Sequence, residues 1–501
     1  MSIEHLDVLV VGAGLSGIGV AHHLRQEHPG RSLALLEARD ELGGTWSLFR
    51  YPGIRSDSDL ATFAFRFRPW TGAKAIADGP DILDYLRQTA RESGIDSLIR
   101  YGHHVVSAAW SSAEGRWTVT VEVEGRTSRL TCTVLFCAGG YYRYDEGYTP
   151  MFPGVEQYAG QLVHPQQWPQ DLDTTGKRVV VIGSGATAVT IVPALARTAG
   201  HVTMLQRSPS YVLPVPSTDP IADVVRALVG PERAHRFTRR KNIAQQRFTY
   251  RLARTRPELV KKIIRALQGH FLPKDFDFSH FTPAYDPWDQ RLCMVPDADL
   301  FKALRRGSAS VVTDTIDTFT PTGIRLRSGA ELPADVVVTA TGLQLLAFGG
   351  IGLTVDGTPV SLPDTVSYKG MMLSGVPNFA YAIGYTNASW TLKVDLVAEH
   401  LCRLLSAMDA AGATTVVPEL PDADAPTRPL LDFAAGYVLR SVDTFPRQGA
   451  AAPWSLNMDY ADDVAMLSRG TVLDPVLRLG SGPGVTTGGA GDPGAPETVA
   501  V

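Results

Sequence analysis

Two segments of the chain space their glycines as a dinucleotide-binding turn requires. The first reads Gly-Ala-Gly-Leu-Ser-Gly from Gly12 to Gly17, directly after the apolar run Asp7–Val11. In such a turn the first glycine permits a sharp bend, the second lets a pyrophosphate approach the backbone, and the third lets the next helix pack closely on the strand. Unpaired N–H groups at the start of that helix attract the phosphates. We therefore expect Gly12, Gly14, Ser16 and Gly17 to bind a dinucleotide.

An acidic residue stands where the ribose of that dinucleotide would lie. Glu37 follows Gly17 by 20 residues and ends a second predicted strand, Ser32–Glu37. A carboxylate at this position accepts hydrogen bonds from ribose hydroxyls. Strand, glycine turn, helix and acid occur together, which argues against a chance cluster of glycines. This first site is predicted to bind FAD.

The second glycine-rich segment differs from the first in the residue that follows its second strand. It reads Gly-Ser-Gly-Ala-Thr-Ala and follows the predicted strand Arg178–Ile182, while Arg207 and Ser208 stand 19 and 20 residues after its last alanine. An acid there would repel a 2′-phosphate, whereas a guanidinium and a hydroxyl would bind one. The second site is therefore predicted to bind NADPH. Its expected contacts are Gly183, Ser184, Gly185, Ala186, Thr187, Ala188, Arg207 and Ser208.

The elements around the two turns predict the organisation of the chain. Each turn is enclosed in a strand–helix–strand pattern typical of a parallel sheet, and the two patterns lie about 170 residues apart. The predicted fold is α/β, with two Rossmann-like dinucleotide-binding domains for FAD and NADPH and a helical insert. The expected units are a discontinuous FAD-binding domain (1–145 and 366–480), an NADPH-binding domain (146–218 and 295–365), a helical insert (219–294) and a disordered tail (481–501).

Composition excludes several classes of protein. The formal charge is −4, from 47 basic and 51 acidic residues, which gives no case for nucleic-acid binding. Four cysteines are too few for a disulfide framework, and the absence of a CxxC pair disfavours a flavin disulfide reductase. No apolar stretch reaches the ~20 residues of a membrane-spanning helix. Because the first residues carry no basic leader, we expect a cytoplasmic protein, and we assign no metal site.

One region is strongly basic. Between Arg233 and Arg265 the chain holds twelve lysines and arginines and one acid, Glu258, so this region carries about +11 and the rest about −15. A solvated helical insert is the simplest interpretation. Steering of anionic NADPH and peripheral contact with acidic lipid are the alternatives.

Two further motifs lie near the nucleotide turns. Gly43-Gly-Thr-Trp46 is followed by Tyr51-Pro-Gly53 and then by Asp57. Just before the second turn, a longer motif begins at Tyr158 and ends in Trp168-Pro169. Together they resemble the motifs of the type I Baeyer–Villiger monooxygenases, a class of flavin monooxygenases.

The longer motif distinguishes between two families of flavin monooxygenases. The Baeyer–Villiger family more often has phenylalanine where this chain has Tyr158. The ordinary flavin-containing monooxygenases share its Gly160 and His164 but usually lack the Trp-Pro ending. The resemblance is therefore to the Baeyer–Villiger family.

The resemblance implies a reaction and two catalytic residues. In that family NADPH reduces FAD, O2 adds at flavin C4a, and the peroxyflavin converts a ketone to an ester or lactone or transfers oxygen to sulfur. The arginine of the family's active-site segment corresponds to Arg291, whose permanent charge would stabilise the peroxyflavin. The motif aspartate corresponds to Asp57, which would orient that arginine and tune peroxide protonation.

The resemblance also assigns cofactor contacts. Thr45, Trp46 and Asp57 belong to the motif expected at FAD, and Val105 would contact the flavin's adenine through its backbone. Arg55 is expected on the NADP side of the site, and Thr341-Gly342 near the boundary between the domains.

Simpler interpretations of these residues stay open. Arg291 and Asp289 form a surface ion pair in one of them. Asp57, in a Ser-Asp-Ser-Asp run, caps a helix in another. His164 is interpreted as a packed structural histidine that organises the segment between the domains, with no part in proton transfer.

The expected activity is Baeyer–Villiger oxidation of a small ketone with NADPH and O2, with oxidation of sulfur in thioamides or sulfides as a second capacity. A monooxygenase that makes N-oxides or S-oxides is the nearest alternative. The other is a flavin- and NADP-binding redox sensor without turnover.

Overall fold

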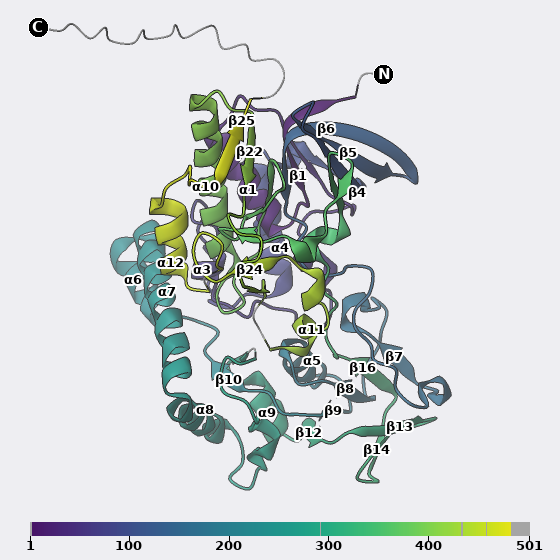
Figure 1. Cartoon of the computed structure of the whole chain (residues 1–501). Helices are drawn as coiled ribbons and strands as arrows, with labels where there is room; N and C mark the ends of the chain where they lie inside the picture. Colours follow the sequence, from purple (N-terminus) through teal and green to yellow (C-terminus); the bar gives the residue numbers. More distant parts are fainter. Residues whose placement is uncertain (1–2, 291, 432–433, 457, 482–501) are drawn as a thin grey trace, which may run out of the picture.

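The computed structural model describes residues 3–290, 292–431, 434–456 and 458–481. Arg291 and nearly all of the expected tail therefore lie outside the described residues. Within them, no helix has the length and apolar character needed to cross a membrane. Figure 1 shows one main sheet in the upper part of the view, a second in the lower part, and helices α6–α8 along one side.

The first nucleotide turn lies in an eleven-stranded sheet of the described residues. Its main path runs β18-β17-β4-β5-β6-β1-β2-β3, and β19–β21 branch from β6. The strands β6, β1, β2 and β3 are parallel, as the strand–turn–helix–strand pattern predicts. The bounds are β1 (His5–Val11), β2 (Leu33–Leu36), β3 (Ile99–Arg100), β4 (His104–Ser111), β5 (Arg116–Val123), β6 (Arg126–Cys137), β17 (Gly352–Val355), β18 (Thr358–Pro359), β19 (Ser367–Tyr368), β20 (Met372–Leu373) and β21 (Phe379–Tyr381).

Helices from both ends of the chain cover this sheet. Apolar residues of α1 and α10 share one buried cluster with residues of β1, and Figure 1 shows the two helices side by side. The helices around this sheet are α1 (Leu15–Glu27), α2 (Thr45–Leu48), α3 (Leu60–Phe63), α4 (Gly79–Glu92), α10 (Trp390–Ala410), α11 (Gly436–Leu439) and α12 (Tyr460–Asp463). Two small antiparallel pairs complete the C-terminal segment: β22 (Thr415–Pro418) with β25 (Leu477–Gly480), and β23 (Thr427–Pro429) with β24 (Arg447–Gly449).

The second turn lies in a five-stranded parallel sheet of order β12-β9-β8-β16-β7. The strands β8 and β16 are apolar and buried along almost their whole length, as strands covered on both faces must be. The elements are β7 (Gln161–Val163), β8 (Arg178–Ile182), α5 (Ala186–Leu195), β9 (His201–Gln206), α9 (Asp299–Arg305), β12 (Ala309–Thr313) and β16 (Val336–Thr339). An antiparallel sheet of β13 (Ile316–Thr320), β14 (Gly323–Leu326) and β15 (Glu331–Pro333) packs beside it. The two sheets and their helices confirm the predicted α/β fold with two Rossmann-like units.

One boundary of the expected units differs from the sheet pairing. The strands β17 and β18 lie in the range 295–365 that we assigned to the NADPH-binding domain, yet β17 pairs with β4 in the first sheet. Sequence pattern alone missed this because such short strands carry no signal for the sheet they join. We now propose that the chain returns to the FAD-binding domain before Gly352.

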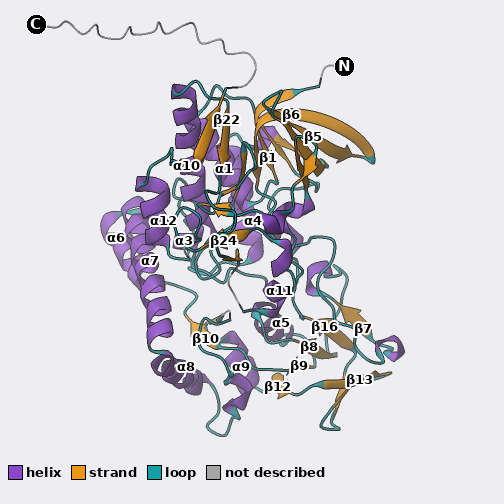
Figure 2. Cartoon of the chain, viewed as in Figure 1, coloured by secondary structure: helices purple, strands orange, loops and turns teal. Residues whose placement is uncertain are grey.

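The helical insert contains three helices that begin with proline, and the basic region from Arg233 to Arg265 spans the second and third of them. The three helices are α6 (Pro220–Val229), α7 (Pro231–Thr255) and α8 (Pro257–Phe271), and Figure 2 shows them as the long helices at one side of the molecule. The following chain forms β11 (Cys293–Pro296), which pairs with β10 (Val212–Val215).

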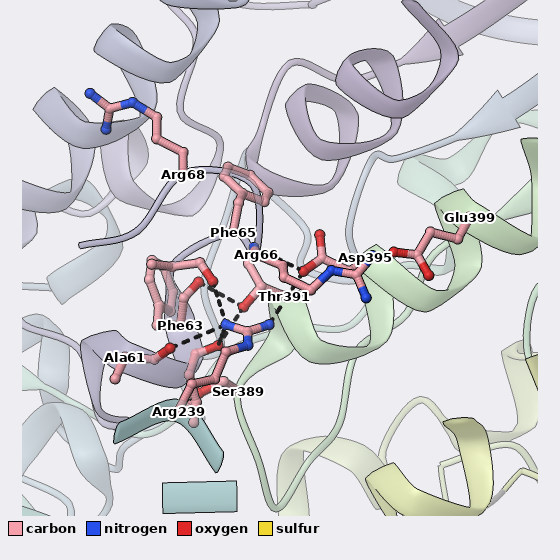
Figure 3. A network of polar contacts seen from close by, with 12 residues as sticks. Ala61, Phe63, Phe65, Arg66, Arg68, Arg239, Ser389, Thr391, Asp395 and Glu399 are labelled. Carbon is pink, nitrogen blue, oxygen red and sulfur yellow. Dashed lines mark hydrogen bonds and ion pairs between the residues drawn. The ribbon is translucent and has the colours of Figure 1, made fainter. Parts of the chain in front are cut away.

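A buried arginine fixes α7 against the first unit. The Arg239 side chain is 8% exposed and donates hydrogen bonds to the backbone oxygens of Ala61, Thr62 and Ala64. It also pairs with Asp395 of α10 at 3.3 Å (Figure 3). A planar guanidinium has enough donors to satisfy these acceptors together. The insert is therefore attached to both α3 and α10.

Loss of this arginine should destabilise the protein. Arg239→Ala leaves the Asp395 carboxylate and the three carbonyl oxygens short of donors, and breaking such a buried pair costs about 3 to 5 kcal/mol. Denaturant unfolding should show that loss. The exposed neighbour Arg240 is the matched control, and Arg240→Ala should change the free energy of unfolding by less than about 0.5 kcal/mol. Equal effects of the two substitutions would contradict the role of Arg239.

Candidate active site

A cavity of about 1430 Å³ lies between the two main sheets, and both glycine-rich turns line it. Such a crevice at the carboxyl ends of parallel strands is where open α/β sheets bind ligands. The expected site residues that line it are Gly12, Gly14, Ser16, Glu37, Thr45, Trp46, Arg55, Asp57, Val105, Gly183, Ser184, Gly185, Ala186, Thr187, Arg207 and Ser208. Neither Gly17 nor Ala188 lines it, because both are packing positions at the starts of their helices.

Backbone geometry explains the glycines of the first turn. Gly12 has φ +99°, which disfavours any other residue, and an added Cβ would lie 2.8 Å from the backbone oxygen of Ala138. A Cβ on Gly17 would lie 2.0 Å from the oxygen of Gly12. Gly14 is the N-cap of α1, where no side chain caps the helix. The first N–H groups of α1 are thus available to a phosphate.

Glu37 is held by the same turn. Its carboxylate accepts hydrogen bonds from the backbone N–H groups of Ala13 (2.9 Å) and Arg39 (3.0 Å). Burial raises the pKa of the Glu37 carboxyl. Because a carboxylate offers about four acceptor positions, both oxygens can still accept from the hydroxyls of a ribose. The residue therefore fits the role expected for it.

The second turn has the same backbone construction. Gly183 has φ +136°, and its added Cβ would lie 2.3 Å from the backbone oxygen of Ala340. Around Gly185, the uncapped N-cap of α5, nothing lies within 4 Å of an added Cβ. Ser184 donates to the backbone oxygen of Ser208 at 3.0 Å, which ties the turn to the exposed Arg207-Ser208 pair. The turn thus offers a phosphate cradle with a cation at its edge.

The segment from Gly43 to Asp57 runs from one turn to the other. At its start, Gly43 donates its N–H to the oxygen of Ala13 at 3.0 Å, and Gly44 approaches Gly14 so closely that an added Cβ would lie 3.1 Å from the Gly14 Cα. Glycine at both positions therefore allows backbone to pack on backbone. Trp46 then packs edge-on against a phenylalanine of α3, with ring centroids 5.6 Å apart.

The other end of this segment packs on the second unit. Tyr51 is 8% exposed, lies in the buried cluster of the second sheet and hydrogen-bonds the Thr187 side chain of α5. Gly53 has φ +78°, and a Cβ there would lie 2.9 Å from the Cβ of Ala194. Arg55 pairs with Asp299, the first residue of α9. The segment, which we call the bridging loop (43–57), thus sets the distance between the two turns.

The structure places Asp57 at the cavity, whereas its expected partner is a residue that the structure does not describe. Asp57 lines the cavity, and its charge acts on Tyr51, whose pKa is raised mainly by burial. The residue that caps α3 is Asp59, which accepts from the backbone N–H of Thr62, so Asp57 does not cap it. The expected partner Arg291 is outside the described residues, but its neighbours Gln290 and Leu292 line the cavity. Asp289, its alternative partner, pairs with Arg254 of α7.

His164 holds two segments together in its neutral form. Its Nδ1 accepts from the backbone N–H of Gln166 (3.1 Å), so Nε2 carries the proton and donates to the backbone oxygen of Gly342 (3.2 Å). Burial lowers the pKa of the imidazole. Thr341 donates to the backbone oxygen of Tyr148 at 2.6 Å. These contacts favour the structural interpretation of the histidine.

Aromatic residues form a wall of the cavity; the segment from Tyr385 to Trp390 was expected to contribute to the pocket, whereas the tyrosines that follow β6 were not identified from the sequence. The wall consists of Tyr141, Tyr142, Tyr144, Tyr385 and Trp390. Trp390 donates its ring N–H to Ser16 Oγ at 2.9 Å across 374 positions of sequence. The glycine pair that follows β6, at the same sheet edge as the first turn, is the signal that could have identified the tyrosines.

A buried ion pair supports this wall. Lys393 and Asp463 are 2% and 0% exposed, lie 2.8 Å apart, and connect α10 to α12. The Tyr385 hydroxyl donates to the same Asp463 carboxylate. Burial raises the pKa of Tyr385 and lowers that of Lys393. Lys393 and Asp463 do not line the cavity themselves, but they hold Tyr385, which does.

Comparison with known proteins identifies relatives over nearly the whole chain. Residues 76–348 match the family model of flavin-binding monooxygenase-like proteins, and residues 10–79 match an NAD(P)-binding Rossmann-like domain. The FAD-containing monooxygenase EthA of Mycobacterium tuberculosis is 54% identical over 96% of this chain and 99% of its own length. EthA of Mycolicibacterium smegmatis is 52% identical over 95% and 97%.

Solved structures share the fold at lower identity. A steroid monooxygenase bound to NADP matches with a TM-score of 0.76 and 22% identity, over 95% of this chain and all of that one. A cyclohexanone monooxygenase in its open form matches with a TM-score of 0.72 and 20% identity over the same shares.

The close contact at Gly53 can be tested directly. Gly53→Ala should push the bridging loop away from α5, so that FAD stays bound while its reduction by bound NADPH slows about 10- to 100-fold, the cost of a misplacement near 1 Å. Gly102→Ala is the control, because Gly102 has a similar φ of +66° but no atom within 4 Å of an added Cβ. Stopped-flow absorbance of the flavin measures both rates. Equal rates in the two variants would contradict the role of the loop.

Proposed function

The chain belongs to the flavin-binding monooxygenase family, and on this premise we propose that it is a Baeyer–Villiger monooxygenase that uses FAD, NADPH and O2 to convert ketones to esters or lactones. As a member of that family it is an NADPH-dependent flavin monooxygenase.

One observation carries the proposal. Two dinucleotide-binding turns open on the same cavity, with the bridging loop between them and an aromatic wall beside it. A cavity of this kind accepts two cofactors and an uncharged, apolar substrate. A structural neighbour has been solved with cyclohexanone, which is a ketone, and this supports the substrate class proposed here.

The proposed cofactor contacts follow from the donors and acceptors of the two turns. The N–H groups of Gly14 and α1 would hold the FAD pyrophosphate and Glu37 its ribose, with Val105 at the adenine. Arg207 and Ser208 would hold the 2′-phosphate of NADPH beside the turn at Gly183. When bound, FAD supplies the reaction with O2, and NADPH supplies the electrons.

The chain's own residues would then control the reacting oxygen atoms. Arg291 is proposed to stabilise the negative charge that develops on them, and Asp57 to orient that guanidinium. Tyr141 and Trp390 would exclude water, which protects a reactive oxygen species from breakdown. The same cavity would admit a thioether or thioamide, whose sulfur accepts an oxygen atom directly.

Arg291 carries the sharpest prediction. In Arg291→Ala, NADPH should still reduce FAD, whereas oxygenation of a ketone should fall about 100-fold or more, as expected when a charge stabiliser is removed. Arg291→Lys keeps the charge without the planar fork and should retain intermediate activity. Gas chromatography of the ester, run beside a flavin-reduction assay, gives both quantities. Undiminished ester formation in the alanine variant would remove Arg291 from the mechanism.

Arg207 should set the preference for NADPH over NADH. Removal of a charged hydrogen bond to the 2′-phosphate should raise the KM for NADPH about 10- to 100-fold in Arg207→Ala. The KM for NADH, which lacks that phosphate, is the internal control and should not change. Steady-state oxidation of each nucleotide measures the ratio. Parallel changes in both constants would point to a distorted turn.

Product analysis separates the alternatives. A ketone and a thioether supplied in turn should give an ester and a sulfoxide. Sulfoxide without ester would indicate a monooxygenase of heteroatoms only. Flavin reduction without either product would indicate a redox sensor.

A further inference from the structure

Exposed apolar side chains concentrate on the helical insert. Among the described residues, nine of the fifteen large apolar side chains with high exposure belong to α6–α8. They are Ile221, Val224, Leu228, Val229, Phe237, Phe248, Leu259, Ile263 and Leu267. Single exposed apolar residues are ordinary, but a concentration of this kind marks an interaction surface.

The spacing of these residues places them on outward faces. In α6, Val224 and Leu228 follow Ile221 by three and seven positions, and in α8, Ile263 and Leu267 follow Leu259 by four and eight. Such spacings repeat with the helical turn and define one face of a helix. The opposite faces pack inward, through Ala222 in α6 and Ile264 in α8.

The long helix α7 follows the same rule. Phe237 and Phe248 are eleven positions apart, close to three helical turns, and are 48% and 65% exposed. Arg239 between them is buried against α3 and α10. The insert is therefore held to the protein by one side of α7 and presents the other to its surroundings.

Lysine and arginine side chains lie among these apolar residues on the insert. Several basic residues of the insert are already paired, such as Lys241 with Asp219 and Arg247 with Asp459. Within the described residues, six exposed basic residues of α7, α8 and their junction make no ion pair: Arg233, Arg236, Arg240, Arg256, Lys262 and Arg265, the last of which stacks on the ring of Phe278. Arg233 and Arg240 lie on the same face as Phe237, and Lys262 on that of Leu259, by their spacings of three and four residues.

We propose that α6–α8 form a docking surface for an anionic lipid bilayer. Apolar side chains that enter the boundary between headgroups and acyl chains, flanked by cations that meet lipid phosphates, are the chemistry of an interfacial helix. The region from Arg233 to Arg265 carries about +11 and the remainder about −15, so an anionic surface attracts this side and repels the rest. A second copy of the chain fits less well, because a symmetric contact would oppose the same cations.

Vesicle co-sedimentation of the FAD-loaded full chain tests the proposal. The protein should sediment with vesicles of phosphatidylcholine and phosphatidylglycerol, weakly with phosphatidylcholine alone, and less in about 0.5 M salt, where surface charges are screened. The triple variant Arg233→Gln, Arg240→Gln, Lys262→Gln should bind anionic vesicles about 100-fold more weakly. The triple variant Leu228→Gln, Phe248→Gln, Leu267→Gln should bind both kinds of vesicle more weakly.

Matched controls lie elsewhere on the surface. The control for charge is the triple variant Arg126→Gln, Arg129→Gln, Lys177→Gln, which removes the same number of positive charges. The control for apolar surface is the triple variant Leu162→Gln, Leu439→Gln, Leu473→Gln. Neither control variant should change vesicle binding. Unaltered Tm and FAD content establish that each variant folds. Vesicle binding equal in the insert and control variants would overturn the proposal. A second result would also overturn it. If sedimentation velocity without lipid shows a dimer, and the insert substitutions convert that dimer to a monomer, the surface binds a second copy of the chain.

Discussion

The contact of the bridging loop with α5 is the constraint on which the site depends. At one end, Gly43 and Gly44 lie backbone to backbone against the first nucleotide turn; at the other, Tyr51 and Gly53 pack on α5. The eleven residues from Gly43 to Gly53 thus connect the two phosphate cradles with little freedom at either end, since even a fully extended residue spans only about 3.3 Å. The loop fixes the distance between the two turns that line the cavity, and a hydride could pass between cofactors held at the two turns only at such a fixed distance.

Parts distant in sequence complete the same cavity. Trp390 reaches Ser16 of the first turn, and Tyr385 is held through Asp463 and Lys393, so the C-terminal segment closes a wall that the N-terminal turn begins. Burying such an ion pair costs desolvation that geometry must offset. This pair lies behind the cavity, and Arg239 lies between the insert and the first unit, so buried charges fix elements in place at both positions.

Local chemistry made the two turns predictable, and long-range packing made the rest unpredictable. A buried strand, glycines at fixed spacing and a polar residue at the end of the next strand are dictated by backbone geometry near the phosphates, so Glu37 and Arg207 could be identified from sequence. Nothing in the sequence near Trp390 indicates its contact with Ser16. The short strands β17 and β18 carried no signal for their sheet, and within a Ser-Asp-Ser-Asp run only the structure distinguishes Asp59, which caps α3, from Asp57, which lines the cavity. The role of Arg291 rests on resemblance and remains a prediction.

The most direct test of the proposed reaction is the fate of molecular oxygen. A ketone should be supplied with NADPH and ¹⁸O₂, and the product analysed by mass spectrometry beside the NADPH consumed. The expected product is an ester or lactone that carries a single ¹⁸O atom, formed in an amount equal to that of the NADPH oxidised. Oxidation of NADPH that yields only labelled hydrogen peroxide, whether or not ketone is present, would contradict the proposed reaction.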